Sequence, residues 1–232
     1  MSATRPFAVI FVLGAPGAGK GTICSHLAET YQLSHYSVGD GLRSWMRENR
    51  TSPLAVQIQD KLDNQGFLAS DDLNPFIGQA IKDALAKDGP KLRGMLADGF
   101  PRCVEQLETF DSWPFQDQLP LAAPDGGDVG VHPKPDIVVC LRITKQNAEA
   151  RYLGRGRDSN DSREKFERRF AEYEAETRAV EDAYRDLGVL IELDVNGTKK
   201  ENLEQMRKTL QASELWQRIM VEGQFSTQFV LS

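Results

Sequence analysis

The pattern of apolar and polar residues along this chain predicts strands and helices in alternation. Four short apolar runs have the length and β-branched content of buried strands, and one more polar stretch is typical of an extended segment. These five stretches are residues 7–13, 34–37, 92–97, 136–141 and 189–193. Strands that alternate with helices favour an α/β fold with a doubly wound, mostly parallel five-stranded sheet and helices on both of its faces.

Helices are predicted between these strands, at residues 24–31, 41–48, 53 onward, 70–87, 104–110, 144–153, 163–187 and 198–210. Two of them carry clear start signals. Ser52 before Pro53 is typical of a helix N-terminus, and Thr198 with Glu201 forms a capping box. The helix after Pro53 is expected to place its apolar residues on one face, at Leu54, Ile58 and Leu62.

Two stretches fall outside this alternation. Residues 113–135 are rich in proline and glycine and are expected to form a surface excursion. The tail, residues 213–232, contains apolar residues that could form an amphipathic turn or two: Leu215, Trp216, Ile219 and Met220. Docking of this turn on the body is favoured over a site for a partner. We therefore expect one domain over residues 1–232, with its core at about 7–211.

Composition narrows the classes of function. The 232-residue chain has a net charge of −6, which argues against a general nucleic-acid binder, whereas a small anionic substrate can still bind to local arginines. The cysteines Cys24, Cys103 and Cys140 have no metal-ligand spacing, so buried thiols in a reducing compartment are expected. No run is apolar for long enough to span a membrane, and the first strand begins by Phe7, which leaves no room for a signal peptide. A cytoplasmic monomer is expected, with the nucleus as a second location.

A glycine-rich run between the first predicted strand and the first predicted helix carries the strongest chemical signal. It reads Gly14-Ala15-Pro16-Gly17-Ala18-Gly19-Lys20-Gly21-Thr22. Glycines let backbone N–H groups curl around a phosphate, and the helix that follows directs its positive end at the same point. Lys20 can then contact the β- and γ-phosphates, and the Thr22 hydroxyl can bind Mg²⁺. The alternative, a glycine-rich turn that binds nothing, is disfavoured by the complete spacing and by the strand–loop–helix context.

An acid and several arginines bracket this loop along the chain. Asp98 ends a predicted strand, where an acid beside Mg²⁺ would lie, and the string Asp98-Gly99-Phe100-Pro101-Arg102 adds an arginine at the same edge of the sheet. Other arginines fall in separate segments: Arg43, Arg151, Arg155, Arg157, Arg168 and Arg169. Any one of them alone would most simply be a solvated surface charge. Together they suit phosphoryl transfer between two phosphorylated substrates, because guanidinium groups bind phosphate oxygens in pairs and stay charged in a dry site.

These motifs resemble those of the adenylate kinase and UMP/CMP kinase family of nucleoside monophosphate kinases. The glycine between Lys20 and Thr22, residues 37–43, the string from Asp98 to Arg102 with Gln106, and residues 151–169 carry the resemblance, which spans about 7–210. It implies a P-loop NTPase fold with a helical insert for the nucleoside monophosphate (NMP) near 37–77 and a short lid near 154–162. It also implies transfer of the terminal phosphate of ATP to an NMP, with Mg²⁺.

The resemblance implies a role for each matching residue. The loop from Gly14 to Thr22 would hold ATP together with Arg151 and Arg155, and Thr22 and Asp98 would organise Mg²⁺, partly through water. The acceptor would be bound by Val38, Gly39, Arg43, Ala69, Gly99, Arg102, Gln106, Arg157 and Arg169. The catalytic groups would be Lys20, Arg102, Arg151, Arg155, Arg157 and Arg169.

The chain departs from the family pattern in two places that bear on function. Val38 replaces a threonine that is typical of adenylate kinases, and an apolar residue there is more similar to UMP/CMP kinases, whereas Gln106 occurs in both. The usual lid acids are shifted to Asp158 and Asp161. We therefore expect a UMP/CMP kinase, with a short-lid adenylate kinase as the first alternative and an inactive nucleotide-binding module as the second. A GTPase is disfavoured because no Asn-Lys-x-Asp string is present.

Overall fold

The computed structural model describes residues 7–64, 68–88, 91–109, 135–155 and 162–224. It contains a five-stranded sheet in which every neighbouring pair is parallel, with the order β2-β3-β1-β4-β5. The strands are β1 (Ala8–Gly14), β2 (Leu33–Ser37), β3 (Gly94–Asp98), β4 (Ile137–Arg142) and β5 (Leu190–Asp194). The predicted doubly wound α/β fold is thus confirmed.

Helices alternate with these strands, as predicted. They are α1 (Lys20–Tyr31), α2 (Val38–Glu48), α3 (Pro53–Asn64), α4 (Ser70–Asp88), α5 (Val104–Glu108), α6 (Lys145–Gly154), α7 (Arg163–Glu172), α8 (Arg178–Asp186), α9 (Lys199–Ala212) and α10 (Glu214–Trp216). The capping box of Thr198 and Glu201 is formed at the start of α9.

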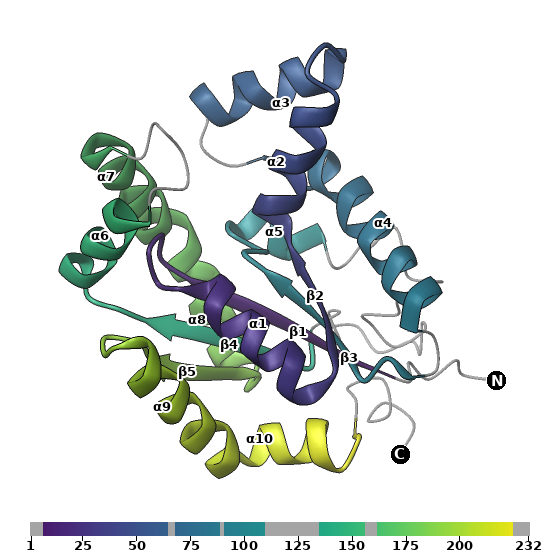
Figure 1. Ribbon diagram of the computed structural model, residues 1–232, viewed down its shortest axis with the longest axis vertical. Coiled ribbons are helices and arrows are strands. Elements are labelled where there is room, and N and C mark those ends of the chain that lie inside the picture. Colours follow the sequence, from purple (N-terminus) through teal and green to yellow (C-terminus); the bar gives the residue numbers. More distant parts are fainter. Residues whose placement is uncertain (1–6, 65–67, 89–90, 110–134, 156–161, 225–232) are drawn as a thin grey trace.

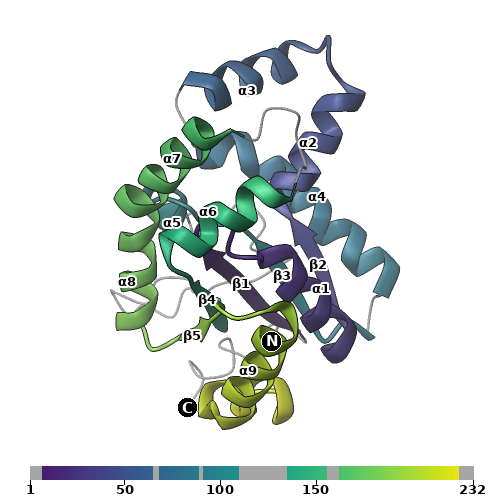
Figure 2. The ribbon, with the colours of Figure 1, turned by 60° about the vertical axis from the view of Figure 1, so that its left-hand side comes forward.

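Helices cover both faces of the sheet (Figures 1 and 2), and the central strand β1 separates two apolar cores. Side chains alternate across a strand. Val9 and Phe11 face a core built with α4 and α8, whereas Ile10 and Val12 face a core built with α1 and α9. Because β1 is buried on both faces, it is apolar at nearly every position, which is typical of a central parallel strand.

The strand order places the glycine-rich loop where ligands bind in such sheets. The chain leaves β1 towards β2 and leaves β3 in the opposite direction, towards β4. The carboxyl ends of β1 and β3 therefore flank the crevice in which open α/β sheets bind ligands. Asp98 ends β3 and pairs in register with Val12 of β1.

Helices α2 and α3 project beyond the sheet at the top of Figure 1. In α3 the predicted apolar face is partly wrong: Ala55 and Ile58 are buried, but Leu54 is 42% exposed. The buried stripe follows the spacing of 55 and 58, while the side chain of Leu62 lies outside the described residues. Helix α2 also begins three residues before the predicted start, because Ser37 caps it by accepting from the Asp40 N–H.

The single helix predicted for 163–187 contains a π-helical turn, Tyr173–Thr177, between α7 and α8. A π turn adds one residue to the helical register and is frequent at functional sites. Here the Thr177 hydroxyl donates to the carbonyl of Arg102 (2.7 Å) and the Tyr173 hydroxyl to Glu181 (2.8 Å). No proline or glycine marks this interruption, so the apolar and polar pattern alone did not reveal it.

The C-terminal segment docks on the body, as predicted. Helix α10 and the π turn Gln217–Val221 bury Trp216 and Ile219, and the Trp216 ring meets Tyr31 of α1 edge-on at 4.9 Å. Arg93 donates to the carbonyl of Met220 (2.7 Å). The predicted excursion falls, apart from Pro135, outside the described residues, as do residues 225–232 of the tail. Among the helices that the structure describes, none is long and apolar enough to cross a bilayer.

Candidate active site

The glycine-rich loop links the end of β1 to α1 and is clamped from one side by α6. A Cβ atom at Gly17 would lie 2.1 Å from the carbonyl oxygen of Ala148, and Gly17 has φ near +85°. Only glycine fits such a position. Ala15 is buried in an aromatic cluster with Tyr152, Phe166, Phe170 and Tyr173 from α6, α7 and the π turn. The loop therefore has a fixed shape before any ligand arrives.

Lys20 is curled back over this loop. Its ammonium group donates to the carbonyl oxygens of Gly14 (2.7 Å) and Ala15 (3.2 Å). The pKa of Lys20 is lowered to about 8, chiefly by burial; Asp98 opposes this shift, and Arg102 and Arg169 act in the same direction as burial. An ammonium that is poorly hydrated and surrounded by other cations gains most from an anionic ligand.

Arg102 is held in the turn that follows β3. Its Nε donates to the carbonyl of Gly99 (2.7 Å), and Gly99 has φ of 77°. A Cβ atom at Gly99 would lie 2.8 Å from the Arg102 guanidinium, so only glycine admits this side chain here. Burial lowers the pKa of Arg102 to about 10, and Arg169 contributes in the same direction.

A second arginine reaches the same point from the helical insert. The guanidinium groups of Arg43 and Arg102 both lie within 3.6 Å of the place where a Cβ atom of Gly39 would stand. Arg43 is also paired with Asp40, one turn earlier in α2. Two guanidinium groups that meet over an open backbone position form a cradle suited to a phosphate.

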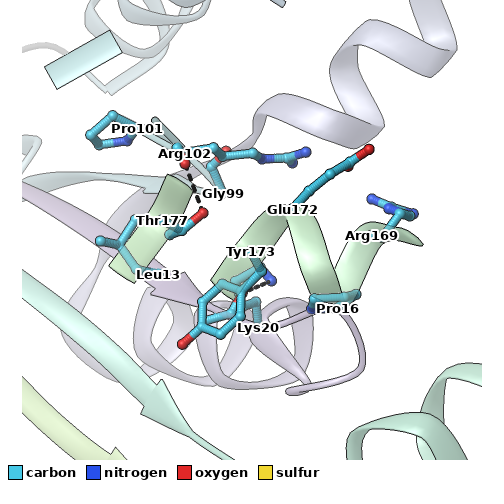
Figure 3. Close-up of a pocket in the computed structure, with 11 residues that line it drawn as sticks. Leu13, Pro16, Lys20, Gly99, Pro101, Arg102, Arg169, Glu172, Tyr173 and Thr177 are labelled. Atoms are coloured by element: carbon cyan, nitrogen blue, oxygen red, sulfur yellow. Dashed lines mark hydrogen bonds between the residues drawn. The ribbon is translucent and has the colours of Figure 1, made fainter. Parts of the chain in front are cut away.

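A cavity of about 60 Å³ connects the loop and Arg102. Its lining comprises Leu13, Gly14, Pro16, Lys20, Gly99, Pro101, Arg102, Arg169, Glu172, Tyr173 and Thr177. Figure 3 shows Arg102 and Glu172 extending alongside each other, with Arg169 beyond them. The structure therefore brings together the predicted Lys20, Arg102 and Arg169.

Three lining residues on the long helix were missed from the sequence: Glu172, Tyr173 and Thr177. They lie on the same face of the long helix as Arg169, three, four and eight residues further on. That spacing could have identified them once Arg169 was placed in the site. Glu172 is a carboxylate that raises the pKa of Arg102, against the larger effects of burial and Arg169, so it partly balances the positive charge of the cavity.

The predicted lid arginines do not all meet. The Arg155 guanidinium lies 4.1 Å from the centre of the Tyr152 ring, and Arg169 lies 5.9 Å from the same ring. Tyr152, also unpredicted, is thus a buried platform shared by two arginines. Arg151 instead donates to the carbonyl of Gly197 (2.6 Å) and is absent from the cavity lining. Arg157 and the lid acids lie outside the described residues.

The predicted metal ligands, Thr22 and Asp98, stand close in the sequence to the lining residues Lys20 and Gly99 but do not line the cavity themselves. Thr22 is exposed in the first turn of α1, and the Asp98 side chain at the end of β3 is 9% exposed. A hydroxyl and a carboxylate are hard oxygen donors, the set that Mg²⁺ prefers. The side chains present therefore fit a magnesium ion held partly through water.

Three of the residues predicted to bind the acceptor differ in how exposed their side chains are. The Gln106 amide is buried, accepts from the N–H of Arg102 (2.7 Å) and donates to the carbonyl of Leu68 (2.6 Å), so it ties the turn after β3 to the insert. Val38 is buried at the start of α2, whereas Ala69 is exposed just before α4.

Next to the arginine cradle lies a larger pocket between α2 and α3. It has a volume of about 660 Å³ and is lined by Arg43, Met46, Arg47, Arg50, Ala55, Val56, Gln59 and Asp60. This volume is within the range of small-molecule sites. Arg43 belongs both to the cradle and to the lining of this pocket, whereas Val38 and Gln106 do not line it.

Comparisons with known proteins agree with this geometry. A family model described as "Adenylate kinase" matches residues 12–189. Adenylate kinase 1 of Nostoc sp. is 30% identical over 203 residues, which are 87% of this chain and 97% of that protein. A UMP-CMP kinase of Lentinula edodes is 32% identical over 80% of this chain and 78% of its own length, and the UMP-CMP kinase of Danio rerio is 29% identical over 88% and 96%. The phosphate loop and the converging arginines agree with the family model and with these relatives. The chain therefore belongs to the adenylate kinase family and is a nucleoside monophosphate kinase.

Proposed function

We propose that this kinase transfers the terminal phosphate of MgATP to UMP or CMP, forming the nucleoside diphosphate and ADP. The observation that carries the choice of acceptor is Val38, an apolar, buried side chain at the start of α2 where the insert meets the arginine cradle. It offers no hydroxyl to a purine, and the nearby Gln106 amide is already engaged at both ends.

The donor phosphates would bind to the loop amides and Lys20. The approach of phosphate favours the ammonium form of Lys20, which exchanges its bonds to the Gly14 and Ala15 carbonyls for phosphate oxygens. Magnesium would be held by Thr22 directly and by Asp98 through water, and it supplies charge neutralisation of the β- and γ-phosphates.

The acceptor phosphate would lie between Arg43 and Arg102, with Arg169 on the side of the donor. This arrangement supports an in-line approach, because Arg102 lines the same cavity as Lys20. The chemistry then requires positioning and neutralisation of charge rather than a nucleophilic side chain. Closure over the substrates would exclude the water that could otherwise hydrolyse ATP.

Two other functions are compatible with parts of these observations. A short-lid adenylate kinase would share every phosphate contact and differ only in the base it accepts. An inactive nucleotide-binding module would keep the fold without turnover, and the altered lid acids favour it. Arg102 and Lys20 in a common cavity argue against inactivity, because a module that only binds ATP has no need of a second, buried arginine site.

An acceptor panel separates these functions. Purified protein is assayed for ADP release from ATP and Mg²⁺ with AMP, CMP, UMP, dCMP or GMP. Preference for CMP and UMP is expected. Preference for AMP would identify an adenylate kinase, and no phosphorylation of any acceptor would overturn the kinase mechanism.

Substitution of Val38 tests how the base is selected. Val38→Thr adds a hydroxyl at nearly constant volume and should shift the kcat/KM ratio towards AMP by on the order of tenfold, the value of one added hydrogen bond. Val38→Ala is the matched control, because it stays apolar and should keep the pyrimidine preference. An unchanged acceptor profile in Val38→Thr would remove the reason for proposing pyrimidines.

A further inference from the structure

Three side chains with soft and hard ligand atoms meet behind the phosphate loop. Cys24 comes from α1, His35 from β2 and Asp98 from the end of β3. One ligand atom from each lies within 4.8 Å of the other two. The chain separates these residues widely, so only the parallel pairing of β2 with β3, and the packing of α1 against them, brings them together.

Cys24 and Asp98 are buried and His35 is partly exposed, and no hydrogen bond joins His35 to Asp98. The Nε2 atom of His35 is 3.9 Å from the Asp98 carboxylate, which is too long for a hydrogen bond. This Nε2 atom is buried and has no hydrogen-bond partner among the described residues. A buried polar atom without a partner destabilises the protein, so an orphan nitrogen aimed at a carboxylate and a thiol points to a missing ligand.

The chemistry of the three ligands selects the kind of cation. Sulfur, imidazole nitrogen and carboxylate oxygen form the donor set of zinc sites, and three protein ligands leave a fourth position open. In a tetrahedral zinc site the ligand atoms stand about 3.4–3.6 Å apart. The His35–Asp98 separation of 3.9 Å is already close to this value, and the two separations from Cys24, which are at most 4.8 Å, must shrink by no more than about 1.4 Å. His35 is the side chain that can move, because it is 21% exposed, whereas Cys24 is fully buried.

We propose that Cys24, His35 and Asp98 form a binding site for a thiophilic divalent cation of the Zn²⁺ class. Binding replaces the thiol proton of Cys24, which passes to water, and leaves the thiolate, the imidazole and the carboxylate on the metal. Mg²⁺ does not compete for this set, because it avoids sulfur and requires oxygen ligands.

Occupancy of this site has a consequence that rests on the proposed function. The same Asp98 carboxylate would organise the magnesium of MgATP, so a cation that captures it makes the enzyme less able to use MgATP. The site would therefore inhibit turnover when zinc is bound.

The binding itself is tested with Co²⁺, whose absorption reports a thiolate ligand. Nucleotide-free, reduced protein is titrated with Co²⁺ and should show a thiolate-to-cobalt charge-transfer band together with tetrahedral ligand-field bands. Cys24→Ala should lose the charge-transfer band, and His35→Gln should weaken binding by tenfold or more. The matched controls Cys103→Ser and His26→Gln should keep the wild-type spectrum. Absence of the band in the wild type, or its survival in Cys24→Ala, would overturn the site.

Two features keep this test independent of folding and of the kinase reaction. His35→Gln changes a partly exposed side chain, so it answers the question if Cys24→Ala does not fold, as judged by circular dichroism. The second arm measures turnover at fixed MgATP with free Zn²⁺ set by a chelator buffer, where His35→Gln should tolerate at least tenfold more zinc than the wild type. Cobalt binding without inhibition by zinc would refute the inference that the proposed metal site and the magnesium of MgATP share Asp98. Lack of turnover with every acceptor would instead refute the proposed function and leave the spectra unaffected.

Discussion

The phosphate loop and the helical insert both present cations to a phosphate, yet they are built differently. In the loop, Ala15 and Ala18 are each 1% exposed, and α6 presses on the backbone at Gly17. In the insert, the Arg43 side chain is 41% exposed and is paired with a neighbouring aspartate on its own helix. The loop is held in shape by buried contacts, whereas the insert presents a charge that water still reaches.

This contrast has an energetic meaning. Lys20 and Arg102 have lost part of their hydration before any substrate arrives. The fold therefore already carries the free-energy cost of this desolvation, and the binding of a phosphate offsets that cost. In the proposed mode of acceptor binding, Arg43 would still have to lose water and leave its aspartate. Changes to Lys20, Arg102 or the loop should therefore alter turnover and stability, and changes to the insert should alter mainly acceptor affinity.

The largest effect should follow from removal of the two partly buried cations. Lys20→Ala and Arg102→Ala should each lower kcat by on the order of 10² or more, because in the proposed mechanism each contacts charge that develops on the transferring phosphoryl group. Steady-state assays with saturating substrates measure this. Lys200→Ala, an exposed lysine on α9, is the control and should turn over normally. Near-normal kcat in either site variant would refute its role.

Rigidity of the loop can be tested with two glycines of similar backbone conformation. Gly17 and Gly19 have φ of 85° and 84°, but a Cβ atom at Gly19 meets nothing within 4 Å. Gly19→Ala should cost about 1–2 kcal/mol of unfolding free energy from left-handed strain alone. Gly17→Ala should cost about 2 kcal/mol more, because α6 must move away. Denaturant unfolding measures both, and equal losses would show that α6 does not clamp the loop.

On the insert, Gly39→Ala probes the arginine cradle. The added methyl would stand 3.4–3.6 Å from guanidinium nitrogens of Arg102 and Arg43, where a phosphate oxygen is expected. We expect KM for the acceptor to rise by roughly tenfold, about 1.4 kcal/mol, with kcat and KM for ATP changed little. Stability should be kept, since alanine favours a helix more than glycine does. A normal acceptor KM would place the phosphate elsewhere.

The smallest effect should come from pH. Burial lowers the pKa of Lys20 to about 8 in the free enzyme, so the cation is lost as pH rises through that value. The kcat/KM for ATP should fall about twofold at pH 8 relative to pH 7 and continue to fall above it. Bound phosphate stabilises the ammonium, so kcat should decline only at higher pH. Lys20→Arg, which stays charged, should flatten the kcat/KM profile around pH 8, and a profile unchanged by that substitution would assign the titration to another group.

The parts of the site that could be predicted from the sequence are those set by local chain geometry. The phosphate loop follows from a strand, a glycine-rich turn and a helix in succession. The turn that carries Arg102 follows from the continuous sequence motif from Asp98 to Arg102. The position of Arg151 could not be predicted, because the carbonyl it binds belongs to Gly197, far along the chain.

Residues without a motif were missed for the same reason. In the sequence, Tyr152 cannot be distinguished from other aromatic core residues. Only the tertiary packing of α6 on α7 reveals two arginines over its ring. Cys24 was expected to be a buried thiol, and it is, but its proximity to His35 needs the order of the sheet. The π turn at Tyr173–Thr177 likewise leaves no proline or glycine in the sequence.

The central place of β1 has a consequence for how the protein is made. β1 pairs on one side from Ala8 with Gly94 and on the other from Ile10 with Ile137, and the core that it forms with α1 and α9 also contains Trp216. Such distant partners make folding slow relative to local helix formation. The nascent phosphate loop has no support from α6 until most of the chain has been synthesised. Nucleotide binding by growing chains would thus report the completion of the fold.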